Sequence, residues 1–462
     1  MLSRTTIENV LSAALEGGGD FSEIYVEDTV STRIAMTGAE VEDASYTRLH
    51  GAGIRIFSRT LSVYASTTAL DEASLIQAAR SAAASLKDGG ETLPPAALKA
   101  QSVLTDVHRP FSTVDNAERI AWLKRGDAAA RDYSGEITQV ASQFLDIDQN
   151  VLIANSQGVF VTANRPRMRA FLQVVASDGA SAQTGTSSPG CLGGFECTDS
   201  IDLEKEGRQA ARSAVTMLHA PHCPAGHFPV VIDGGFGGVI FHEACGHSLE
   251  ATSVSRGNSE FAGKLGRKIA GEKVTAIDDG TLPGQWGSIF VDDEGTPAQR
   301  IVLIERGILK NYMIDRLGGL RMGMMPTGSS RRQNYTFAPT SRMTNTFIAA
   351  GDDDEDEMIA TMGDGLYAKR MGGGSVNPMT GEFNFSVTEG YWVKGGKIVS
   401  PVQGATLIGK GADVLWKVDR VGPRMWMGQG MCGSVSGSIP TNVGQPRIRV
   451  SGLTVGGKGG RL

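Results

Sequence analysis

The sequence contains little cysteine and no long hydrophobic run. Its five cysteines, at positions 191, 197, 223, 245 and 432, are few, odd in number and widely spaced, which argues against a disulfide framework. The first residues, MLSRTTIENVLSAALEGGGDFSE, lack the apolar segment of a signal peptide. No window approaches the ~18 uninterrupted apolar residues that a membrane helix needs. These absences predict a protein of the reducing cytoplasm that does not enter a membrane.

A strong charge of either sign is also missing. The 44 basic and 50 acidic residues give a formal net charge of −6, which offers no electrostatic reason to bind nucleic acid or an anionic membrane. Glycine, by contrast, is abundant: it occupies 60 of the 462 positions, well above the usual share of ~7%. Since the glycines follow no collagen-like period, they indicate many turns and close backbone approaches in a β-rich fold.

The first half of the chain has the pattern of helices alternating with strands. Apolar residues at helical spacing predict helices at 5–16, 70–86, 115–132 and 202–218. Extended segments between turn residues predict strands at 23–27, 32–36, 53–57, 61–65, 137–146, 150–154, 158–163 and 167–176. Strands joined by short turns and backed by a few helices predict an antiparallel sheet in an α+β domain.

The character of the sequence changes at residues 220–229, where APHCPAGHFP carries three prolines and ends the preceding helix. We therefore predict an N-terminal α+β domain over 1–220 and a β-rich C-terminal domain over 221–462. In the second domain short strands alternate with glycine turns, and one helix is expected near 354–369. The acidic run at 352–357 falls where that helix begins, and it lacks the ligand spacing of a calcium loop.

One segment carries the residue types of a metal site. His242-Glu243-Ala-Cys-Gly-His247 is one residue longer than the metalloprotease pattern H-E-x-x-H. On a regular α-helix, residues four apart lie about 40° from each other, whereas residues five apart lie about 140° apart and diverge. Both imidazoles can reach one ion only if the helix is distorted. A π-bulge absorbs the extra residue, and Gly246 is where the backbone departs most readily from helical angles.

If the two histidines bind zinc, Glu243 can act as general base on the attacking water. A catalytic zinc needs a third protein ligand, and two candidates remain open: Glu250, one turn past His247, and Cys432 in the glycine-rich segment GQGMCGSVSG. Cys245 is sterically awkward because it lies between two ligands on the same turn. The motif alone is also compatible with two histidines satisfied by backbone groups in a buried helix.

Ordered segments of the second half resemble one known family. HEACGHSLE (242–250) resembles the HEAxGHxLE signature of the TldD/PmbA metallopeptidases. Further segments resemble that family in the same order: VDDEGTPAQRIVLIERGILKNYMIDR (291–316), MMPTGSSRRQNY (324–335), RMTNTF (342–347), GGGSVN (372–377), PVQGATLIGKG (401–411) and VGQPRIRVSGLTVGG (443–457). The resemblance covers the region from 228 to 457 and is faint before 220.

This resemblance implies a zinc metallopeptidase in which His242, His247 and Cys432 bind the metal and Glu243 is the catalytic base. It implies hydrolysis of small or unfolded peptides in an enclosed chamber, where the peptide adds as a β-strand. It also implies dimers in which a motif-bearing subunit pairs with a homologous subunit lacking the motif. This chain keeps the motif, so we expect the active subunit of such a heterodimer, or a homodimer, with the N-terminal domain as scaffold and dimerisation unit.

Two other functions stay open at this point. The first is a non-catalytic partner that binds peptides or gyrase-like clients, although its mark would be a broken motif. The second is a metallohydrolase of another amide, because the same zinc and glutamate serve any carbonyl.

Three further groups of residues have a structural and a functional interpretation. A linker with incidental histidines is favoured over a second metal site for one cluster: His219, His222, Cys223 and His227. The second group is Arg331, Arg332 and Tyr335. We predict that these are exposed loop residues or line a substrate chamber, in preference to stabilising an oxyanion. The glycines at 372–374 fit a plain turn or the close approach of a peptide backbone.

Overall fold

The computed structural model describes residues 2–86, 94–377 and 380–459. Its N-terminal half is built on an eight-stranded sheet with the order β3-β2-β1-β5-β6-β4, in which β7 and β8 also pair with β6. These strands are β1 Phe21–Thr37, β2 Glu40–Ser58, β3 Leu61–Thr67, β4 Lys99–Val103, β5 Ile137–Asn155, β6 Val159–Ser177, β7 Ala182–Ser187 and β8 Gly190–Leu192. Neighbours run antiparallel except β4 and β6. The predicted antiparallel α+β architecture is confirmed.

The strands are longer than the sequence predicted. β1 spans 17 residues and β2, β5 and β6 span 19 each, so the short strands expected along them are parts of continuous strands. The polar residues that suggested turns are paired inside the sheet. Gln149, for example, lies between the strands predicted at 137–146 and 150–154, and its Nε2 donates to Oε1 of Glu27 on β1 (2.9 Å). Partners from distant parts of the chain thus make these polar residues compatible with a strand.

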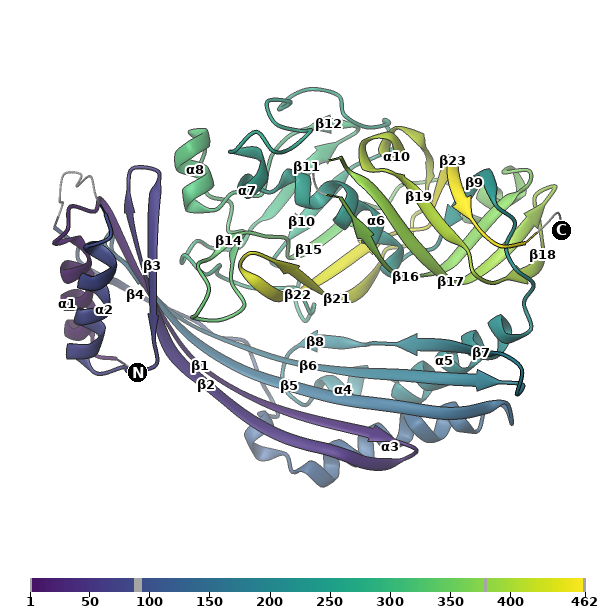
Figure 1. Cartoon of the computed structure of the whole chain (residues 1–462), viewed down its shortest axis with the longest axis horizontal. Helices are drawn as coiled ribbons and strands as arrows, with labels where there is room; N and C mark the ends of the chain where they lie inside the picture. The colour runs from purple at the N-terminus through teal and green to yellow at the C-terminus, as the bar shows by residue number, and fades with distance from the viewer. Residues whose placement is uncertain (1, 87–93, 378–379, 460–462) are drawn as a thin grey trace.

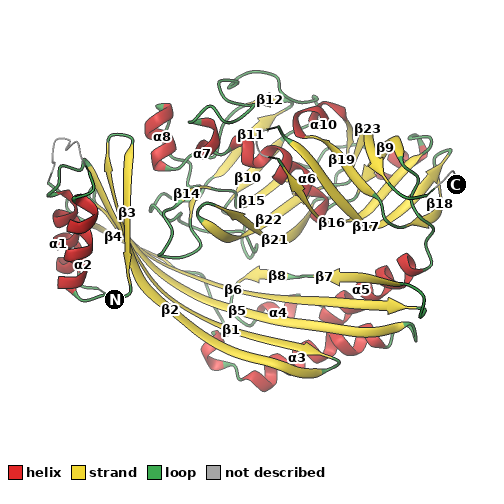
Figure 2. Cartoon of the chain, viewed as in Figure 1, coloured by secondary structure: helices red, strands yellow, loops and turns green. Residues whose placement is uncertain are grey.

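The four predicted helices of this half are confirmed. They are α1 Arg4–Leu15, α2 Glu72–Ala83, α3 Asn116–Arg131 and α5 Leu203–Leu218, joined by the short helices η1 Phe111–Thr113 and α4 Cys197–Ser200. Each long helix begins after a side-chain cap that accepts a backbone N–H of the first turn: Ser3, Asp71, Asp115 and Asp202. Helices α1 and α2 pack at one end of the sheet, and α3 covers the face turned away from the C-terminal half (Figures 1 and 2). Helix α5 packs against α3 and β7 and also reaches the C-terminal half, where Oγ of its Ser213 donates to Glu389 of β17.

The C-terminal half is β-rich, as predicted. One sheet has the order β12-β11-β10-β15-β22-β21, a second has the order β16-β9-β23-β19-β17-β18 with β20 on β23, and β13 pairs with β14. The strands are β9 Gly226–Ile232, β10 Ala276–Asp279, β11 Arg300–Glu305, β12 Ile308–Leu309, β13 Ser330–Arg331, β14 Thr340–Ser341, β15 Asn345–Ile348, β16 Gly365–Val376, β17 Glu382–Lys394, β18 Lys397–Val402, β19 Thr406–Lys410, β20 Val418–Val421, β21 Trp426–Ser434, β22 Gly437–Gln445 and β23 Ile448–Gly456.

Several short helices lie among these strands. They are η2 Phe236–Gly238, α6 Val239–Phe241, η3 His242–Gly246, η4 His247–Leu249, α7 Ala251–Val254, α8 Arg316–Met322, α9 Glu355–Ala360 and α10 Gly411–Lys417. The helix predicted at 354–369 is wrong in extent, because α9 ends at Ala360 and the chain continues as β16. Its acidic start is confirmed: the side chain of Asp354 accepts the backbone N–H groups of Asp356 and Glu357. The glycines at 372–374 lie within β16, so of their two interpretations the plain turn is wrong, and the close approach of a peptide backbone stays a prediction.

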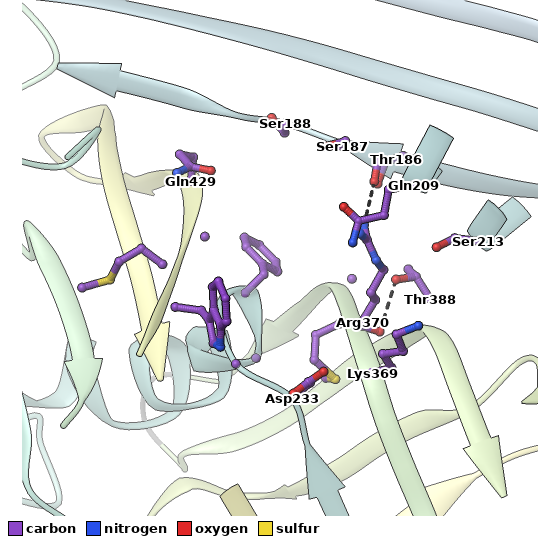
Figure 3. Close-up of a pocket in the computed structure, with 18 of the residues that line it drawn as sticks. Thr186, Ser187, Ser188, Gln209, Ser213, Asp233, Lys369, Arg370, Thr388 and Gln429 are labelled. Carbon is purple, nitrogen blue, oxygen red and sulfur yellow. Dashed lines mark hydrogen bonds between the residues drawn. The ribbon is translucent and has the colours of Figure 1, made fainter. Parts of the chain in front are cut away.

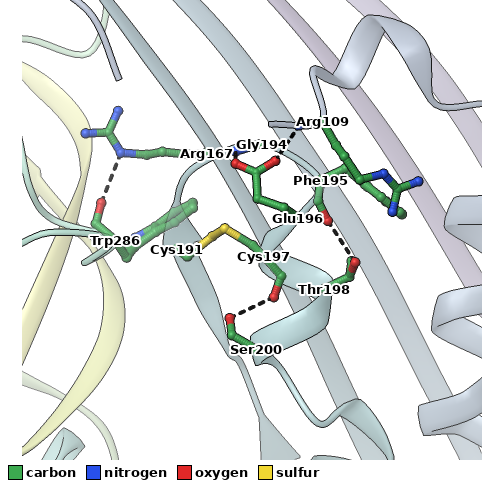
Figure 4. The surroundings of a disulfide bond; sticks show 10 residues. All are labelled: Arg109, Arg167, Cys191, Gly194, Phe195, Glu196, Cys197, Thr198, Ser200 and Trp286. Carbon is green, nitrogen blue, oxygen red and sulfur yellow. Dashed lines mark hydrogen bonds between the residues drawn. A yellow bond between two sulfur atoms is a disulfide. The ribbon is translucent and has the colours of Figure 1, made fainter. Parts of the chain in front are cut away.

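The structure joins Cys191 and Cys197 in a disulfide beside Trp286 (Figure 4). The expectation that the cysteines are too far apart to pair is therefore wrong for these two, which stand six positions apart, Cys191 within β8 and Cys197 at the start of α4. The other three cysteines, Cys223, Cys245 and Cys432, are free and buried. The cytoplasmic setting inferred from the cysteine content stays a prediction. Within the described ranges, no helix has both the length and the apolar character needed to cross a membrane.

A buried ionic network connects the two halves of the chain. Arg55 on β2 pairs through Nη2 with Glu23 on β1 (2.9 Å) and with Glu294 of the C-terminal half, and Arg332 reaches Glu23 from that half (3.1 Å). These side chains are at most 2% exposed. Burying charges is tolerable only where each is paired, so this network fixes how the halves sit against each other. The division of the chain at residue 220 stays a prediction.

Replacing Arg55 by methionine is expected to destabilise the protein by about 3–5 kcal/mol, because Glu294 then loses a buried ionic partner. The matched control is Arg48→Met on the same strand. Arg48 also pairs with a β1 carboxylate, Asp28 (2.7 Å), but both side chains are about half exposed, and such pairs contribute ~0–1 kcal/mol. Urea titration of both variants measures the difference. Equal unfolding midpoints for the two variants would contradict the structural importance of the buried network.

Candidate metal centre

The segment with the two histidines is a helix of changing pitch buried in the C-terminal core. Three α-helical residues, Val239–Phe241, lead into a π-helical turn over His242–Gly246, and a 3₁₀ turn follows over His247–Leu249. The predicted local distortion is therefore confirmed. A π-helical turn holds more residues than an α-helical one, which brings side chains five apart onto the same side of the helix.

Position 246 requires glycine for a different reason from the one that the sequence suggested. Its backbone angles are φ −56° and ψ −51°, which any residue adopts in a helix, so a departure from helical angles is not what requires glycine. A Cβ atom at this position would lie 2.3 Å from Sδ of Met343. The glycine is needed for close packing of the helix against that side chain.

Three possible ligand atoms converge beside this helix. Nε2 of His242 lies 3.2 Å from Sγ of Cys432, and Nε2 of His247 lies 3.3 Å from the same sulfur. The imidazole rings are nearly perpendicular, at 83°, with centroids 5.2 Å apart. Cys432 comes from β21, the strand at the end of the six-stranded sheet. In the described ranges these three residues are the group of histidine, cysteine and carboxylate side chains close enough together to share one metal ion.

The donor set fits zinc. Tetrahedral coordination with ~2.3 Å to sulfur and ~2.0–2.1 Å to nitrogen places the two ligand atoms about 3.6 Å apart, close to the separations seen here. Thiolate and imidazole donors together favour zinc among the common divalent metals. Three protein ligands leave one coordination position for water or substrate, which distinguishes a catalytic from a structural site.

The protonation of this cluster also favours a cation. Burial alone would raise the pKa of the Cys432 thiol, but the imidazoles of His242 and His247 beside it lower this pKa to about 3. Burial would likewise lower the pKa of His247, but the carboxylate of Glu250 and the sulfur of Cys432 raise it well above its usual value. A thiolate and a carboxylate are thus held around the imidazoles, and positive charge is favourable between them.

Two glutamates flank His247 in different positions. Oε1 of Glu250 lies 3.2 Å from Nδ1 of His247, the ring nitrogen opposite to the one facing Cys432. Such a carboxylate orients a metal-binding histidine and raises its basicity. Oε2 of Glu243 lies 3.7 Å from Nε2 of His247, on the ligand side, and its side chain is 29% exposed. Of the two residues that the sequence left open as third ligand, Cys432 lies with the histidine Nε2 atoms and Glu250 lies behind His247.

The remaining sequence candidates lie elsewhere. Cys245 is buried in the hydrophobic core, where burial raises its pKa well above the usual value. His219 pairs with Glu136 on the surface (2.7 Å), and Cys223 is buried as a free thiol. The expectation that the residues at 331, 332 and 335 are exposed loop residues is wrong: they are 4–6% exposed. Arg332 belongs to the ionic network, and Tyr335 donates its backbone N–H to Glu27 (2.8 Å).

A cavity of about 690 Å³ lies between the two halves, beside the strand that carries Cys432. Figure 3 shows Thr186, Ser187 and Ser188 of the N-terminal half facing Lys369 and Arg370 across it. Nη1 of Arg370 donates to the carbonyl oxygen of Thr186 (3.3 Å). This cavity could not be predicted from the sequence, because its walls come from segments far apart in the chain and carry no short motif.

Comparison with known families finds matches over most of the chain. The PmbA/TldA metallopeptidase domain 1 matches residues 22–86, the central domain of that family matches 109–218, and its C-terminal domain matches 225–457.

Comparison with individual proteins gives the same family. A metalloprotease TldD homolog of Haemophilus influenzae is 33% identical over an alignment of 470 positions, which covers 99% of this chain and 97% of the relative. A zinc metalloprotease TldD homolog of Saccharolobus solfataricus is 30% identical over 56% of this chain and 58% of its own length. The crystal structure of TldE from Thermococcus kodakarensis superposes with a TM-score of 0.77 at 18% identity, covering 97% of this chain and 99% of that one. This last likeness shows the fold.

Proposed function

The chain belongs to the TldD/PmbA metallopeptidase family, and from that membership we propose that it is a zinc-dependent peptidase. Its substrates are small or unfolded peptides. The ligands are His242, His247 and Cys432, and Glu243 is the general base. The observation that carries the proposal is the convergence of two imidazole nitrogens on one sulfur, each Nε2 within 3.3 Å of Sγ of Cys432, with a carboxylate on the same side.

Each residue of the site has a separate task in this proposal. Zinc, when bound, polarises the scissile carbonyl and lowers the pKa of water. Glu243 takes the proton from the attacking water and passes it to the departing amine. Glu250 accepts the proton-bearing Nδ1–H of His247, which fixes the ring orientation and leaves Nε2 unprotonated on the side of the metal. The buried environment of His242 and Cys432 limits the access of bulk water and so strengthens the electrostatic interactions in the site.

The position of β21 supports a peptide substrate. Because β21 is the last strand of its sheet, one of its edges has no partner strand among the described residues, apart from a single bridge between Met427 and Gly235. An extended peptide can add to such an edge through main-chain hydrogen bonds, which makes few demands on sequence. The strand carries Cys432, so a peptide bound there lies beside the metal ligands.

The structural likeness to TldE supports a homologous partner subunit. TldE is similar to this chain over nearly the whole length of both, so a pseudo-symmetric heterodimer is geometrically reasonable. We propose that this chain is the motif-bearing subunit of such a pair, with a homodimer as the alternative assembly. Size-exclusion chromatography with light scattering, with and without a co-expressed homologous subunit that lacks the motif, distinguishes the two.

Metal removal tests the proposed activity. Incubation of the full chain with a strong chelator is expected to abolish hydrolysis of an unstructured peptide, and added Zn²⁺ is expected to restore it, because every step depends on the polarised carbonyl. Product masses report the cleavage. A series of amino-acid amides is the control for another amide substrate. Activity that survives metal removal, or that is confined to the amides, would contradict the peptidase proposal.

A further inference from the structure

The cavity beside β21 is more basic than the rest of the molecule. The chain as a whole has a net charge of −6. Among the cavity-lining residues that the structure describes, five are basic and two are acidic: Arg169, Lys369, Arg370, Arg424 and Arg447 against Asp233 and Glu355. A cavity with an excess of one charge concentrates ligands of the opposite charge.

Four of these cations have carboxylate partners. The pairs are Arg424–Glu355, Arg447–Asp233, Lys369–Glu389 and Arg370–Glu389. Arg169 differs, because in the described part of the chain no carboxylate lies within ion-pair distance of it. Burial lowers the pKa of Arg169, as expected for a cation that has lost water without gaining an anion.

The guanidinium of Arg169 is nevertheless held in place. Nε donates to Oγ of Ser188 (2.7 Å), and Nη2 donates to the carbonyl oxygen of Gln429 on β21 (3.3 Å). The group also lies over the ring of Trp286, 5.6 Å from its centroid. Of its five N–H groups, these bonds use two, which leaves both N–H groups of Nη1 and one of Nη2. Nη1 and Nη2 together form the edge that binds a carboxylate through two parallel hydrogen bonds.

We propose that Arg169 binds a carboxylate of the peptide substrate, which refines the proposed peptidase function and rests on it. The carboxylate is the α-carboxylate at the peptide's C-terminus or the side chain of an aspartate or glutamate. Gln429, which Arg169 contacts, precedes Cys432 by three residues on β21. At ~3.3 Å per residue, an extended peptide places this carboxylate about three residues from the scissile bond. Arg169 is thus a specificity-determining residue that acts away from the bond that is cleaved.

Peptide binding tests this role independently of turnover. The zinc-loaded full chain with Glu243→Gln serves as parent, so that bound peptide is not cleaved. Three N-terminally dansylated peptides are titrated by fluorescence. The first two consist of neutral residues and end in a free carboxylate or in an amide, and the third also ends in an amide but contains one glutamate. Arg169→Gln and Arg169→Lys are compared with Arg125→Gln, which removes an exposed arginine on α3 that pairs with Glu204.

At least one carboxylate peptide is expected to bind the parent about 10-fold tighter than the neutral amide, a typical effect of a charge-assisted hydrogen bond. Arg169→Gln should remove this preference, Arg169→Lys should retain part of it, and Arg125→Gln should retain all of it. A loss confined to the free acid identifies the α-carboxylate, and a loss for the glutamate peptide identifies the side chain.

Equal affinities of the parent for all three peptides would overturn the proposal, and so would a preference that survives Arg169→Gln. The first comparison needs no Arg169 variant, so the proposal stays testable even if Arg169→Gln fails to fold. Turnover of the neutral amide by the wild-type chain tests the peptidase function separately. Cleavage without any carboxylate preference overturns only the role of Arg169, whereas a carboxylate preference without cleavage overturns only the peptidase function.

Discussion

Replacing Glu243 by glutamine is expected to lower kcat for peptide hydrolysis by about 10²- to 10⁴-fold while the zinc stays bound. The amide has nearly the size of the carboxylate but cannot accept a proton from the attacking water. Glu243 is placed for this task, because its Oε2 lies 3.7 Å from Nε2 of His247 and its side chain is partly exposed on the ligand side. KM should change little, since the lost interaction belongs to the transition state. Steady-state kinetics and elemental mass spectrometry measure both quantities.

Glu250→Gln is the matched control for this variant. It removes the carboxylate on the other side of the same imidazole, 3.2 Å from Nδ1 of His247. Such a change weakens metal affinity by roughly 10- to 100-fold, so at saturating zinc kcat should stay near that of the wild type. A Glu243→Gln variant that keeps more than a tenth of wild-type kcat would exclude this residue as general base. Loss of zinc from Glu243→Gln would instead assign the residue as a ligand.

The helices of the N-terminal half could be predicted from sequence because their signals are local. Ser3 and Asp115, for example, stand directly before the first helical turn and accept its backbone N–H groups. The lengths of the strands could not be predicted in the same way. Gln149 has the polarity of a turn residue, and only the pairing of β5 with β1 brings it to Glu27. Short polar segments are therefore ambiguous until their distant partners are known.

The candidate metal site was likewise predictable from sequence only where its signals are local. The requirement for a distorted helix followed from the angle between residues five apart, and the π-helical turn over His242–Gly246 meets it. The choice between Glu250 and Cys432 did not follow from spacing, because Cys432 is 185 residues from His247 along the chain. Only the sheet order, with β21 beside the helix, brings them together. The resemblance of the sequence to a known family supplied that information, and local chemistry did not.

The buried arginines were the least predictable feature. Arg332 lies in a segment rich in serine and glycine, which is typical of an exposed loop. Its burial depends on Glu23 and Tyr25 of β1, more than 300 positions earlier, which provide an ion pair at 3.1 Å and an aromatic ring 4.2 Å from the guanidinium. Composition cannot reveal such a pair, since either partner alone would be exposed.

A further buried arginine positions the third proposed ligand. Arg342 is fully buried and donates through Nη2 to the carbonyl oxygen of Cys432. Its Nη1 donates to Oγ of Ser436 (2.9 Å) and to the carbonyl oxygen of Gly437 (2.9 Å). These bonds hold the hairpin of β21 and β22, so the thiol is fixed relative to the helix before any metal binds. Preorganisation of this kind lowers the cost of assembling the site.

Replacing Cys432 by alanine is therefore expected to remove zinc from the chain and to reduce peptide hydrolysis to background. Alanine deletes the one anionic donor among the three proposed ligands, and Glu250 cannot replace it without moving, because it faces the opposite nitrogen of His247. Elemental mass spectrometry of identically purified protein should find about one zinc per wild-type chain and much less in Cys432→Ala. His242→Ala provides the reference for the zinc content of a chain that has lost one of the proposed histidine ligands.

Cys245→Ala is the control that separates ligation from the general loss of a buried thiol. Cys245 lies within the same helical turn as the histidines, but it packs in the hydrophobic core, so this variant should keep its zinc and its activity. If Cys432→Ala and Cys245→Ala both lose zinc, the loss reports damage to the core and the thiolate assignment fails. If Cys432→Ala keeps zinc, the thiolate is not the third ligand, and a carboxylate takes its place: Glu243 from the ligand side, or Glu250 after rotation away from Nδ1 of His247. Only loss from Cys432→Ala together with retention in Cys245→Ala fits a site of two imidazoles and one thiolate.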